Sequence, residues 1–528
     1  MSAKFPEYKG LNLPNVAKVM LEYWAENSIF EKSVTTREGN KPFVFFEGPP
    51  SANGLPGVHH VLARAIKDIF PRYKTMKGFQ VKRKAGWDTH GLPIELGVEK
   101  ELGITKEDIG KTITVEEYNA ACRKAVMRYT DIWNDLTQKM GYWVNMDDPY
   151  ITYEPKYMES VWWLLKQIYE KNLMYKGYTI QPYSPKAGTG LSSHELNQPG
   201  TYQDVTDTTV VAQFKAIKET LPDFLQNEGD IYFLAWTTTP WTLPSNTALT
   251  VGAKIDYVLV DTFNQYTFEP SKVILAKNLV GKQFGGKKNI QVEGVDKLNE
   301  YNSGDKKIPF HVVKEFKGQD LLEIRYEQLL DYVLPHNNPQ DAFRVIAGDF
   351  VTTEDGTGIV HTSPTFGADD ALVAKQASPE IPPMLIKDEN DNLVPLVDLQ
   401  GKFVKELGEF GGKYVKNEYY KEGEAPEKSI DVELAIKLKE ENKAFKVEKY
   451  KHSYPNCWRT DKPILYYPLD SWFIKVKDVK ERMHELNKTI NWKPASTGEG
   501  RFGNWLANAN DWNLSRSRYW GIPLPIWR

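Results

Sequence analysis

Residues 43–60 read FVFFEGPPSANGLPGVHH, and this stretch predicts the centre of the fold. The apolar run at 43–46 is rich in β-forming residues, which is typical of a strand buried on both faces of a parallel sheet. The loop at 47–57 holds three prolines and three glycines, so the chain turns there. A helix is expected to begin near His59, with an apolar face made of Val61, Leu62, Ala65, Ile66, Ile69, Phe70 and Tyr73. Strand, glycine-rich loop and helix in this order are typical of an α/β sheet that binds a nucleotide at the carboxyl ends of its strands.

The composition excludes several classes of protein. The 528 residues predict three or four domains, at about 150 residues per domain. With 41% hydrophobic and 26% charged residues, collagen-like, disordered and disulfide-scaffold proteins are excluded. No apolar run reaches the roughly 18 residues of a membrane span. Residues 1–10 are polar and lack the apolar core of a secretory signal.

The charge and the cysteine content indicate the surroundings of the protein. Its 67 basic and 70 acidic residues give a net charge of −3, so any RNA contact must come from local basic patches. The chain has only two cysteines, Cys122 and Cys457, which argues against a disulfide framework and favours a reducing cytoplasm. We therefore expect a cytoplasmic protein without a membrane partner.

The pattern of the sequence changes near residue 200 from mostly helical to β-rich, and this change divides the chain. Residues 1–40 are predicted as an N-terminal helical segment, and 41–199 as the α/β sheet domain with a helical end. Short β-rich runs then alternate with turns, which predicts a mainly β domain inserted at 200–448. Residues 449–528 return to mixed α/β character. The β-rich runs are at 208–214, 231–236, 257–261 and 358–361.

Two helices are predicted outside the sheet domain. The helix at 15–30 is amphipathic and is expected to pack on the protein. The helix at 431–442 lies in a charged stretch and is expected to be a solvated surface helix. The apolar positions of the first helix are Val16, Val19, Met20, Tyr23 and Trp24.

His59 and His60 lie where the loop becomes a helix, next to free backbone amides and the positive end of the helix dipole. A polyphosphate there would gain hydrogen bonds from amides and imidazoles, which would stabilise charge on its oxygens during attack on phosphorus. A Walker-type loop is excluded, because the Gly-Lys-Ser/Thr ending is absent. The alternative is a pair of helix-capping histidines without a ligand.

The wider sequence narrows these alternatives. The segments EGPP at 47–50 and GVHH at 57–60 resemble the first signature of the class I aminoacyl-tRNA synthetases, in which a His-x-Gly-His motif binds ATP. The segment GWDTHGLPIE at 86–95 is similar to the isoleucine-specific branch of that family. The resemblance extends from residues 23–24 to 520–523. It implies a Rossmann-like parallel sheet that is interrupted by a mainly β editing domain.

The resemblance also implies roles for individual residues. ATP would contact Gly48, Pro49, Gly57, His59 and His60, with Gly57, His59 and His60 acting on the reacting phosphate and Mg²⁺ on the phosphate oxygens. The Pro49 carbonyl and the Asp88 carboxylate would hold the ammonium group of isoleucine, and Trp520 would wall the side-chain pocket. The alternative for Asp88 is a helix-capping or turn aspartate.

One departure from the family pattern is plain. The usual first histidine and the glycine of the motif align with Gly57 and His59, so the motif reads Gly-Val-His-His. His60 keeps the last histidine, and Gly57 allows the close backbone approach that the displaced glycine would provide. We expect altered sensitivity to inhibitors of the ATP site.

Two polar segments of the inserted region also carry a pattern. Residues 236–242 read WTTTPWT, and residues 361–370 read HTSPTFGADD. Alone, the threonine run is typical of ordinary β-structure. Together, the segments predict a hydroxyl-lined pocket with one histidine and one carboxylate, which suits hydrolysis of a small ester. Both resemble the editing domain of the isoleucine, valine and leucine synthetases, which deacylates mischarged tRNA.

A second site of this kind has a physical reason. A pocket for isoleucine rejects valine by only one methylene, about 1–3 kcal/mol, which is too little for accurate translation. By the resemblance, Asp370 would bind the amino group of the amino acid. The neighbouring Asp369 is the alternative for this role; if it has no such role, it is an exposed carboxylate in a turn. Thr242 and His361 would exclude the extra methylene of isoleucine. The reactive end would be lined by Thr237, Thr238, Thr239 and Asn246.

Some relatives carry a four-cysteine zinc knuckle around the insertion. Here Ser184, Ala187 and Thr460 cannot supply thiolates, so no zinc is predicted and Cys457 is expected to be a buried small hydrophobe. The Lys-Met-Ser-Lys-Ser signature is absent from these 528 residues. The expectation is an N-terminal fragment of a longer synthetase.

Three functions remain open at this point. The first is an isoleucine–tRNA ligase that uses ATP, isoleucine and tRNA(Ile) and acts as a monomer. The second is a stand-alone deacylase, which would need none of Pro49, His60 and Asp88. The third is a non-catalytic tRNA-binding module, which would not need Asp370 beside the threonine run.

Overall fold

The computed structural model describes residues 10–527, and internal contacts divide the chain into two compact units. The first unit comprises Met1–Tyr175, Ile474–Ala509 and Arg518–Arg528, and the second comprises Lys176–Phe473 and Asn510–Ser517. The second unit therefore interrupts the first along the sequence. The polar start of the chain, residues 1–9, lies outside the described residues. None of the described helices is both long enough and apolar enough to cross a membrane.

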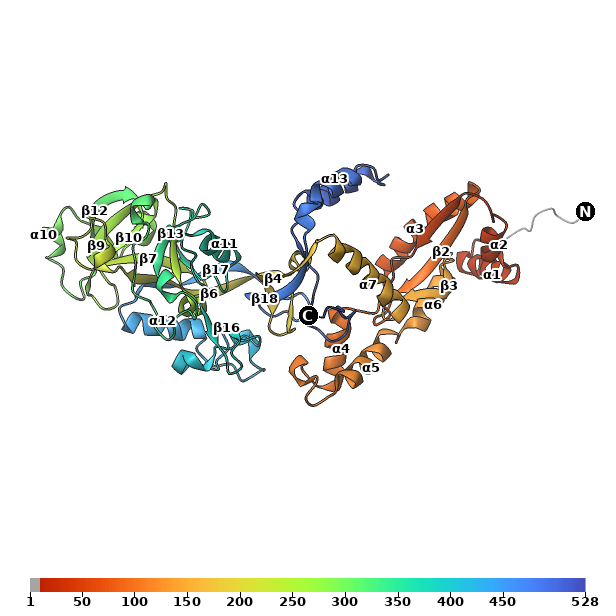
Figure 1. Ribbon diagram of the computed structural model, residues 1–528, viewed down its shortest axis with the longest axis horizontal. Helices are drawn as coiled ribbons and strands as arrows, with labels where there is room; N and C mark the ends of the chain where they lie inside the picture. Colours follow the sequence, from red (N-terminus) through yellow and green to blue (C-terminus); the bar gives the residue numbers. More distant parts are fainter. Residues whose placement is uncertain (1–9, 528) are drawn as a thin grey trace, which may run out of the picture. The chain divides into compact units, whose positions relative to one another are not determined.

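The first unit contains a parallel sheet of three strands in the order β1-β2-β3 (Figure 1). α3 connects β1 to β2, so the strand, loop and helix predicted from residues 43–60 are confirmed. This is the βαβ pattern of one half of a doubly wound nucleotide fold. The strands are β1 (Pro42–Phe46), β2 (Gln80–Trp87) and β3 (Asn145–Ile151), and the helices are α1 (Leu13–Glu26), α2 (Ile29–Thr35), α3 (Val58–Met76), α4 (Leu92–Leu102), α5 (Val115–Val126), α6 (Thr130–Lys139), α7 (Pro155–Glu170), α13 (Lys480–Asn487), α14 (Ala495–Thr497) and α15 (Gly503–Ala507).

The expectation that β1 is buried on both faces is wrong. Its residues alternate between exposed and partly buried, and Val44 and Phe46 are 59% and 61% exposed. On the face that carries these two side chains, the ring of Phe46 contacts that of Tyr150 on β3, with centroids 6.2 Å apart, and both Val44 and Phe46 remain more than half exposed. The apolar run thus forms the strand as predicted, but neighbours cover only one side of it.

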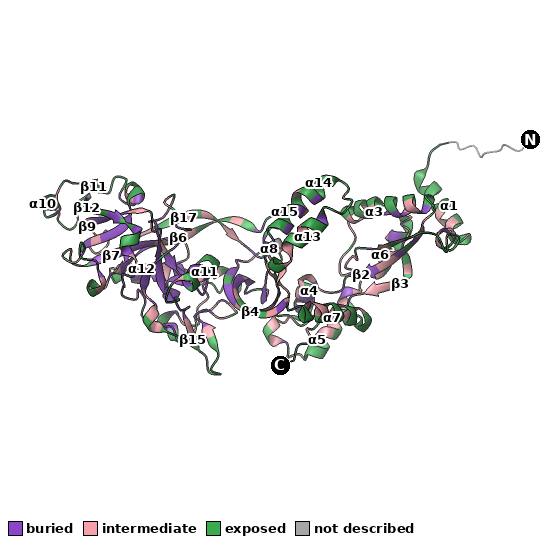
Figure 2. Cartoon of the chain, turned by 45° about the horizontal axis from the view of Figure 1, so that its top comes forward, coloured by how far each residue is buried: buried purple, intermediate pink, exposed green. Residues whose placement is uncertain are grey.

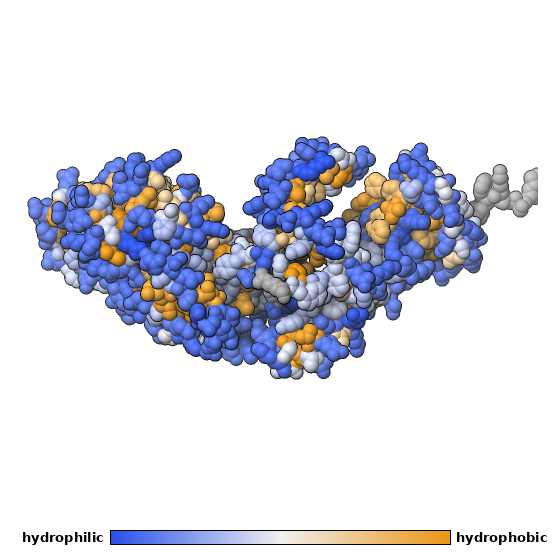
Figure 3. All heavy atoms as spheres, in the orientation of Figure 1, coloured by the Kyte–Doolittle hydropathy of each residue, from blue (hydrophilic) through white to orange (hydrophobic). Residues whose placement is uncertain are grey.

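The predicted apolar face of α3 is also turned away from the unit. Its polar side is buried instead: Arg64 donates to the hydroxyl of Thr137 at 2.8 Å and lies over the ring of Trp133, and Thr75 accepts from Arg83 at 2.8 Å. Because these buried polar groups bond to α6 and β2, they hold that side inward. Figures 2 and 3 show α3 as largely exposed and apolar. The exposed apolar residues are Leu62, Ile66, Ile69, Phe70 and Tyr73.

The N-terminal helical segment differs from its prediction in a similar way. The expected single helix is two helices, α1 and α2, which meet at Ser28 in the left-handed region. Trp24 packs edge-on against Trp143 with ring centroids 5.2 Å apart, as the prediction requires. The other four predicted packing residues are exposed, because α1 contacts its neighbours along a narrow strip only; they are Val16, Val19, Met20 and Tyr23.

The second unit is mainly β, and its bounds, Lys176–Phe473 with Asn510–Ser517, are wider than the insertion predicted at 200–448 (Figure 1). Its ten-stranded sheet runs β11-β12-β9-β10-β7-β14-β8-β13, and β6 pairs with both β7 and β17. The parallel pair of β7 and β14 brings the ends of these two strands to one edge of the sheet. The strands are β6 (Tyr202–Lys215), β7 (Ile231–Thr237), β8 (Ala248–Val251), β9 (Asp256–Phe263), β10 (Pro270–Ala276), β11 (Asn289–Gln291), β12 (Ile308–Lys317), β13 (Arg344–Ala347), β14 (Ile359–Thr362) and β17 (Ala444–Pro455).

Smaller elements complete this unit. A four-stranded sheet has the order β19-β18-β4-β5, and β15 pairs with β16. Cys457 is fully buried, as predicted. These elements are β4 (Met174–Ser184), β5 (Thr189–Gly190), β15 (Leu385–Lys387), β16 (Leu393–Pro395), β18 (Leu465–Ile474), β19 (Trp512–Asn513), α8 (Ser193–Leu196), α9 (Val280–Gln283), α10 (Val295–Leu298), α11 (Ala368–Gln376) and α12 (Ile430–Glu440).

α12 is not the solvated surface helix that its charges predicted. Its residues Leu434 and Leu438 are fully buried in the main apolar core of the unit. Asp431 is also buried, and its carboxylate accepts a hydrogen bond from the amide of Trp241 at 2.9 Å. The charged stretch thus contributes one buried carboxylate, which holds the loop with the threonine run at 236–242 (the threonine loop) in place.

Candidate functional site

Gly57, His59 and His60 lie where the loop joins α3. The Gly57 amide donates a 2.9 Å hydrogen bond to Nδ1 of His60, so the proton of the neutral imidazole is on Nε2. The rings of His59 and His60 lie 3.8 Å apart, and His60 also contacts Trp133 edge-on. Burial, followed by the charges of His59 and Arg64, lowers the pKa of His60. His60 is therefore a neutral hydrogen-bond donor at pH 7.

These residues fit the phosphates of a nucleotide. The amides of Val58 and His59 donate to no other described residue, and they stand at the positive end of the α3 dipole. A Cβ at Gly57 would lie 2.8 Å from Cε1 of His59, so glycine lets this ring fold over the loop. Gly48 is exposed on the same loop. The loop and helix together offer amide and imidazole donors to phosphate oxygens.

The loop that carries Pro49 lies beside Asp88 and Trp520 at the carboxyl end of β2. The Asp88 amide donates to the Pro50 carbonyl at 3.0 Å, which ties the loop after β1 to the end of β2. The indole Nε1 of Trp520 donates to the Thr89 carbonyl at 2.6 Å. Desolvation by the neighbouring protein raises the pKa of Asp88. A carbonyl, a carboxylate and an indole ring therefore lie around one short segment.

Glu95 was given no role by the sequence, although it lies within the motif at 86–95. It is 1% exposed, and its carboxylate accepts hydrogen bonds from the amide of Trp520 at 3.0 Å and from Nε of Arg518 at 2.8 Å. Glu95 thus positions Trp520. No local pattern could have found this pairing, because the partners are more than 400 residues apart.

The threonine loop and β14 form one continuous chain of hydrogen bonds in the second unit. Thr237 bonds to Thr239 at 3.3 Å, and Thr242 donates to the Thr239 carbonyl at 2.8 Å. The Thr242 hydroxyl also bonds to Nε2 of His361 at 3.0 Å, and Nδ1 of His361 bonds to Nδ2 of Asn246 at 2.9 Å. The structure therefore brings together five of the predicted residues.

The direction of this chain follows from its ends. Tyr326, which is 1% exposed, donates to Oδ1 of Asn246 at 2.6 Å, so the amide nitrogen of Asn246 faces His361 and donates to Nδ1. The imidazole proton is then on Nε2 and is donated to Thr242. Burial lowers the pKa of His361 to about 4, so the ring is neutral. Both ring nitrogens are engaged, so His361 positions Thr242 and does not act as a general base.

Asp370 lies in the first turn of α11, which follows the loop after β14, and is outside this chain of hydrogen bonds. Its carboxylate accepts a 2.8 Å bond from the Ser363 amide, and burial raises its pKa to about 6, which leaves it mostly ionised at pH 7. The two loops meet where Trp241 contacts Phe366 edge-on at 5.1 Å. Thr238 lies on the threonine loop but makes no hydrogen bond that joins it to the chain, and Asp369 is exposed.

Tyr326 and Asp431 were missed by the sequence analysis. Tyr326 orients Asn246, and Asp431 holds the Trp241 amide. A tyrosine outside the predicted strands and an aspartate in a charged helix give no signal of these roles. Both act through bonds between residues at least 80 positions apart.

The positions compared with a zinc knuckle make ordinary contacts. The Ser184 hydroxyl accepts a hydrogen bond from the Ala187 amide at 3.2 Å, and Cys457 is buried. Within residues 10–527, apart from the side chains of residues 193 and 194, which the structure does not describe, no group of three or more histidine, cysteine or acidic side chains is arranged to hold a metal ion.

Residues 19–528 match the family model described as tRNA synthetases class I (I, L, M and V). The chain belongs to the class I tRNA synthetases. Among its relatives, the isoleucine–tRNA ligase of Cytophaga hutchinsonii is 64% identical over 98% of this chain and 46% of its own length. The enzyme of Bacteroides fragilis is 62% identical over 100% of this chain and 47% of its own length. The enzyme of Clostridium tetani is 43% identical over 96% of this chain and 43% of its own length. This synthetase chain spans about half the length of the curated relatives it matches.

Solved structures of leucyl-tRNA synthetases are more distant from this synthetase chain. A ternary complex of Agrobacterium radiobacter K84 agnB2 LeuRS with tRNA and LeuAMS is 13% identical, with a TM-score of 0.29, over 85% of this chain and 48% of that one. The editing domain of the P. knowlesi cytosolic leucyl-tRNA synthetase is 14% identical, with a TM-score of 0.24, over 35% of this chain and 66% of that one.

Proposed function

We propose that this chain carries the amino-acid activation site and the editing site of an isoleucine–tRNA ligase. The observation that carries the proposal is its 64% identity to a relative of that name over 98% of the chain. The site geometry is compatible with it, because one unit offers hydrogen-bond donors for phosphate and the other a cluster of threonine hydroxyls bonded to His361. The substrates would be ATP, isoleucine and tRNA(Ile), for a monomer acting in the cytoplasm.

In the proposed activation step, the isoleucine carboxylate attacks the α-phosphorus of ATP, and pyrophosphate leaves. The amides at the start of α3 and Nε2–H of His60 donate to the phosphate oxygens as charge builds on them. Bound Mg²⁺ would neutralise further phosphate charge. The Asp88 carboxylate and the Pro49 carbonyl hold the ammonium group, so catalysis rests mainly on positioning.

In the proposed editing step, water attacks the ester carbonyl between valine and the terminal ribose of tRNA(Ile), and the ribose oxygen leaves with a proton. Ionised Asp370 holds the valine ammonium group. The threonine hydroxyls orient the water and the ribose. The Thr242–His361 bond fixes a wall that leaves room for valine and crowds out the extra methylene of isoleucine.

Release of valine from valyl-tRNA(Ile) by the 528-residue chain tests this proposal. We expect release from valyl-tRNA(Ile) and little from isoleucyl-tRNA(Ile). Asp370→Ala should slow the release by roughly 10- to 100-fold, the value of a hydrogen-bonded charge contact. Asp369→Ala is the matched control, because it removes an exposed carboxylate from the same turn.

The pattern of the two variants decides the outcome. Loss of release in Asp370→Ala alone supports the ammonium-binding role. Equal release by Asp370→Ala and the unmodified chain contradicts it. An effect of Asp369→Ala instead assigns the role to the neighbouring carboxylate.

A further inference from the structure

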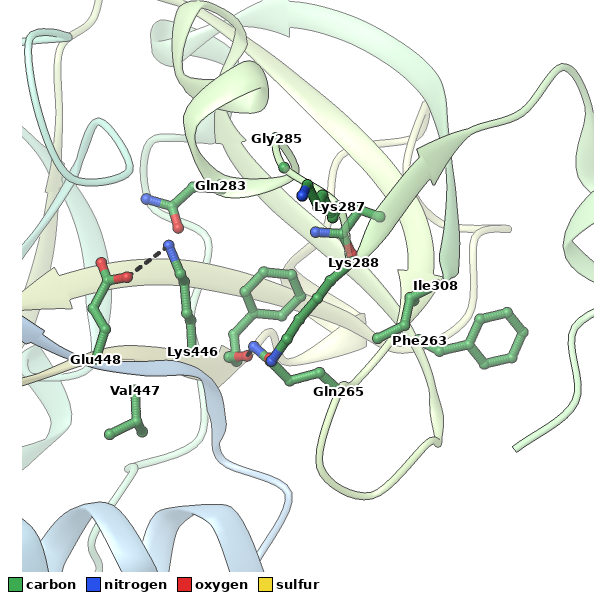
Figure 4. A pocket seen from close by; sticks show the side chains of 13 residues that line it. Phe263, Gln265, Gln283, Gly285, Lys287, Lys288, Ile308, Lys446, Val447 and Glu448 are labelled. Atoms are coloured by element: carbon green, nitrogen blue, oxygen red, sulfur yellow. Dashed lines mark hydrogen bonds and ion pairs between the residues drawn. The ribbon is translucent and has the colours of Figure 1, made fainter. Parts of the chain in front are cut away.

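A pocket of about 390 Å³ lies in the second unit, and none of the threonine, histidine or aspartate residues of the proposed editing site lines it. It is formed where the chain after β9, the loop between α9 and β11, and the start of β17 meet (Figure 4). Its volume lies within the range of small-molecule sites. The polar lining residues are Gln265, Gln283, Lys287, Lys288, Asn289, Lys446 and Glu448.

The charge of the lining is positive. Lys446 forms an ion pair with Glu448 at 2.9 Å, so these two charges compensate each other. Lys287 and Lys288 are exposed and form no ion pair with any residue whose side chain the structure describes. Two uncompensated ammonium groups at one hollow attract an anion, and the attraction is strongest where solvent is partly excluded.

The backbone of the loop adds donors to this charge. Gly286 has a φ of +97°, and a Cβ on Gly285 would lie 2.1 Å from the Gly281 carbonyl oxygen, so both positions require glycine. The amides of Gly285, Gly286 and Lys287 donate to no other described residue. Consecutive free amides beside lysines form the kind of concavity that binds phosphate groups.

Two glutamines add a different chemistry to the lining. Nε2 of Gln283 donates to the Gly356 carbonyl at 2.7 Å, and Nε2 of Gln265 donates to the Phe445 carbonyl at 2.8 Å. These bonds fix the amide orientation, so both Oε1 atoms remain acceptors. Oε1 of buried Gln283 has no partner among the described residues. A matching ligand carries hydroxyl or amino donors beside its anionic group.

We propose that this pocket binds a ribonucleotide, with its phosphate on the Lys287–Lys288 loop and its hydroxyl or amino groups toward the glutamines. The same chemistry has two sources, a free nucleotide and one nucleotide of a bound RNA. For the second source, the inference rests on the proposed function, because the RNA would be the tRNA. For the first, it is independent of that function.

The test is hydrogen-exchange protection of residues 283–291 in the 528-residue chain, with adenosine monophosphate, inorganic phosphate or a short single-stranded oligoribonucleotide added. The variant is Lys287→Ala with Lys288→Ala, which removes two unpaired exposed charges. The matched control is Lys421→Ala with Lys428→Ala, an equal loss of exposed charge outside the pocket. A further variant, His60→Ala, weakens nucleotide binding at the start of α3, so protection that persists in it does not come from that site.

We expect protection of 283–291 in the unmodified chain, the control and His60→Ala, and apparent affinity lowered by roughly tenfold or more in the double lysine variant. Protection by the mononucleotide assigns a free-nucleotide site, and protection by the oligoribonucleotide alone assigns an RNA contact. No protection by any probe, or equal protection in the double lysine variant, overturns the proposal. Asp370→Ala separates this result from the editing proposal, because it should impair valine release without changing protection here.

Discussion

The hydroxyl of Tyr326 is the buried end of the hydrogen-bond chain that orients His361. Tyr326→Phe removes this hydroxyl and leaves Oδ1 of Asn246 without its 2.6 Å donor. Tyr326 and Asn246 are 1% and 3% exposed, so water cannot replace the lost donor without opening the site. An unsatisfied buried acceptor costs about 1–3 kcal/mol, and the ring packing against Phe214 is unaffected.

Hydrogen exchange of β14, which carries His361, measures this cost. A loss of 1–3 kcal/mol in the opening free energy corresponds to roughly 5- to 150-fold faster exchange of the β14 amides. Valine release should slow as well, because Asn246 is then free to turn its amide and His361 loses its fixed tautomer.

Tyr332→Phe is the matched control for this change. Its hydroxyl also makes a 2.6 Å bond to an acceptor, Oε1 of Glu409, but at the surface, where water replaces it. Exchange in β14 should be unchanged in this control. The reasoning is refuted if Tyr326→Phe leaves β14 exchange as slow as Tyr332→Phe does.

Three further predictions concern the same unit. Because burial raises the pKa of Asp370 to about 6, valine release should fall with a midpoint near pH 6 between pH 7.5 and 5. A flat profile over that range would count against an ionised Asp370. Burial lowers the pKa of His361 to about 4 from 6.5, so its contribution to stability is complete above pH 6.5 and is lost as the pH falls toward 4. The loss amounts to about 3 kcal/mol, and the urea midpoint of His361→Asn should depend less on pH over this range than that of the unmodified chain. Asp431→Ala removes the acceptor of the Trp241 amide and one of the carboxylates near buried Lys416, so thermal unfolding should show a loss of about 3–5 kcal/mol, and a loss below about 1 kcal/mol would contradict this role.

The strand, loop and helix of residues 43–60 could be predicted from the sequence, because local composition determines where the chain extends, turns and coils. The strands of the inserted unit followed from the same kind of pattern. The sequence did not predict which side of each strand or helix becomes buried. The apolar side of α3 faces outward because Arg64 and Thr75 form buried hydrogen bonds on the other side.

The sequence predicted one pocket from the residue types of segments 236–242 and 361–370, and the resemblance to a family assigned roles to their residues. The structure joins them because β7 and β14 run in parallel and end at one edge of the sheet. Tyr326 and Asp431 reach this site from other parts of the chain, and no local pattern marks them.

By itself, the sequence determined the element types, the interrupted α/β organisation and the kinds of side chain available for chemistry. These properties depend on neighbours along the chain. Only the tertiary structure decided that His361 is neutral and protonated on Nε2, that Asp370 is anchored by the Ser363 amide, and that lysines about 160 residues apart line one pocket. Burial and hydrogen bonding set these properties, and both depend on residues that are close in space but distant in sequence.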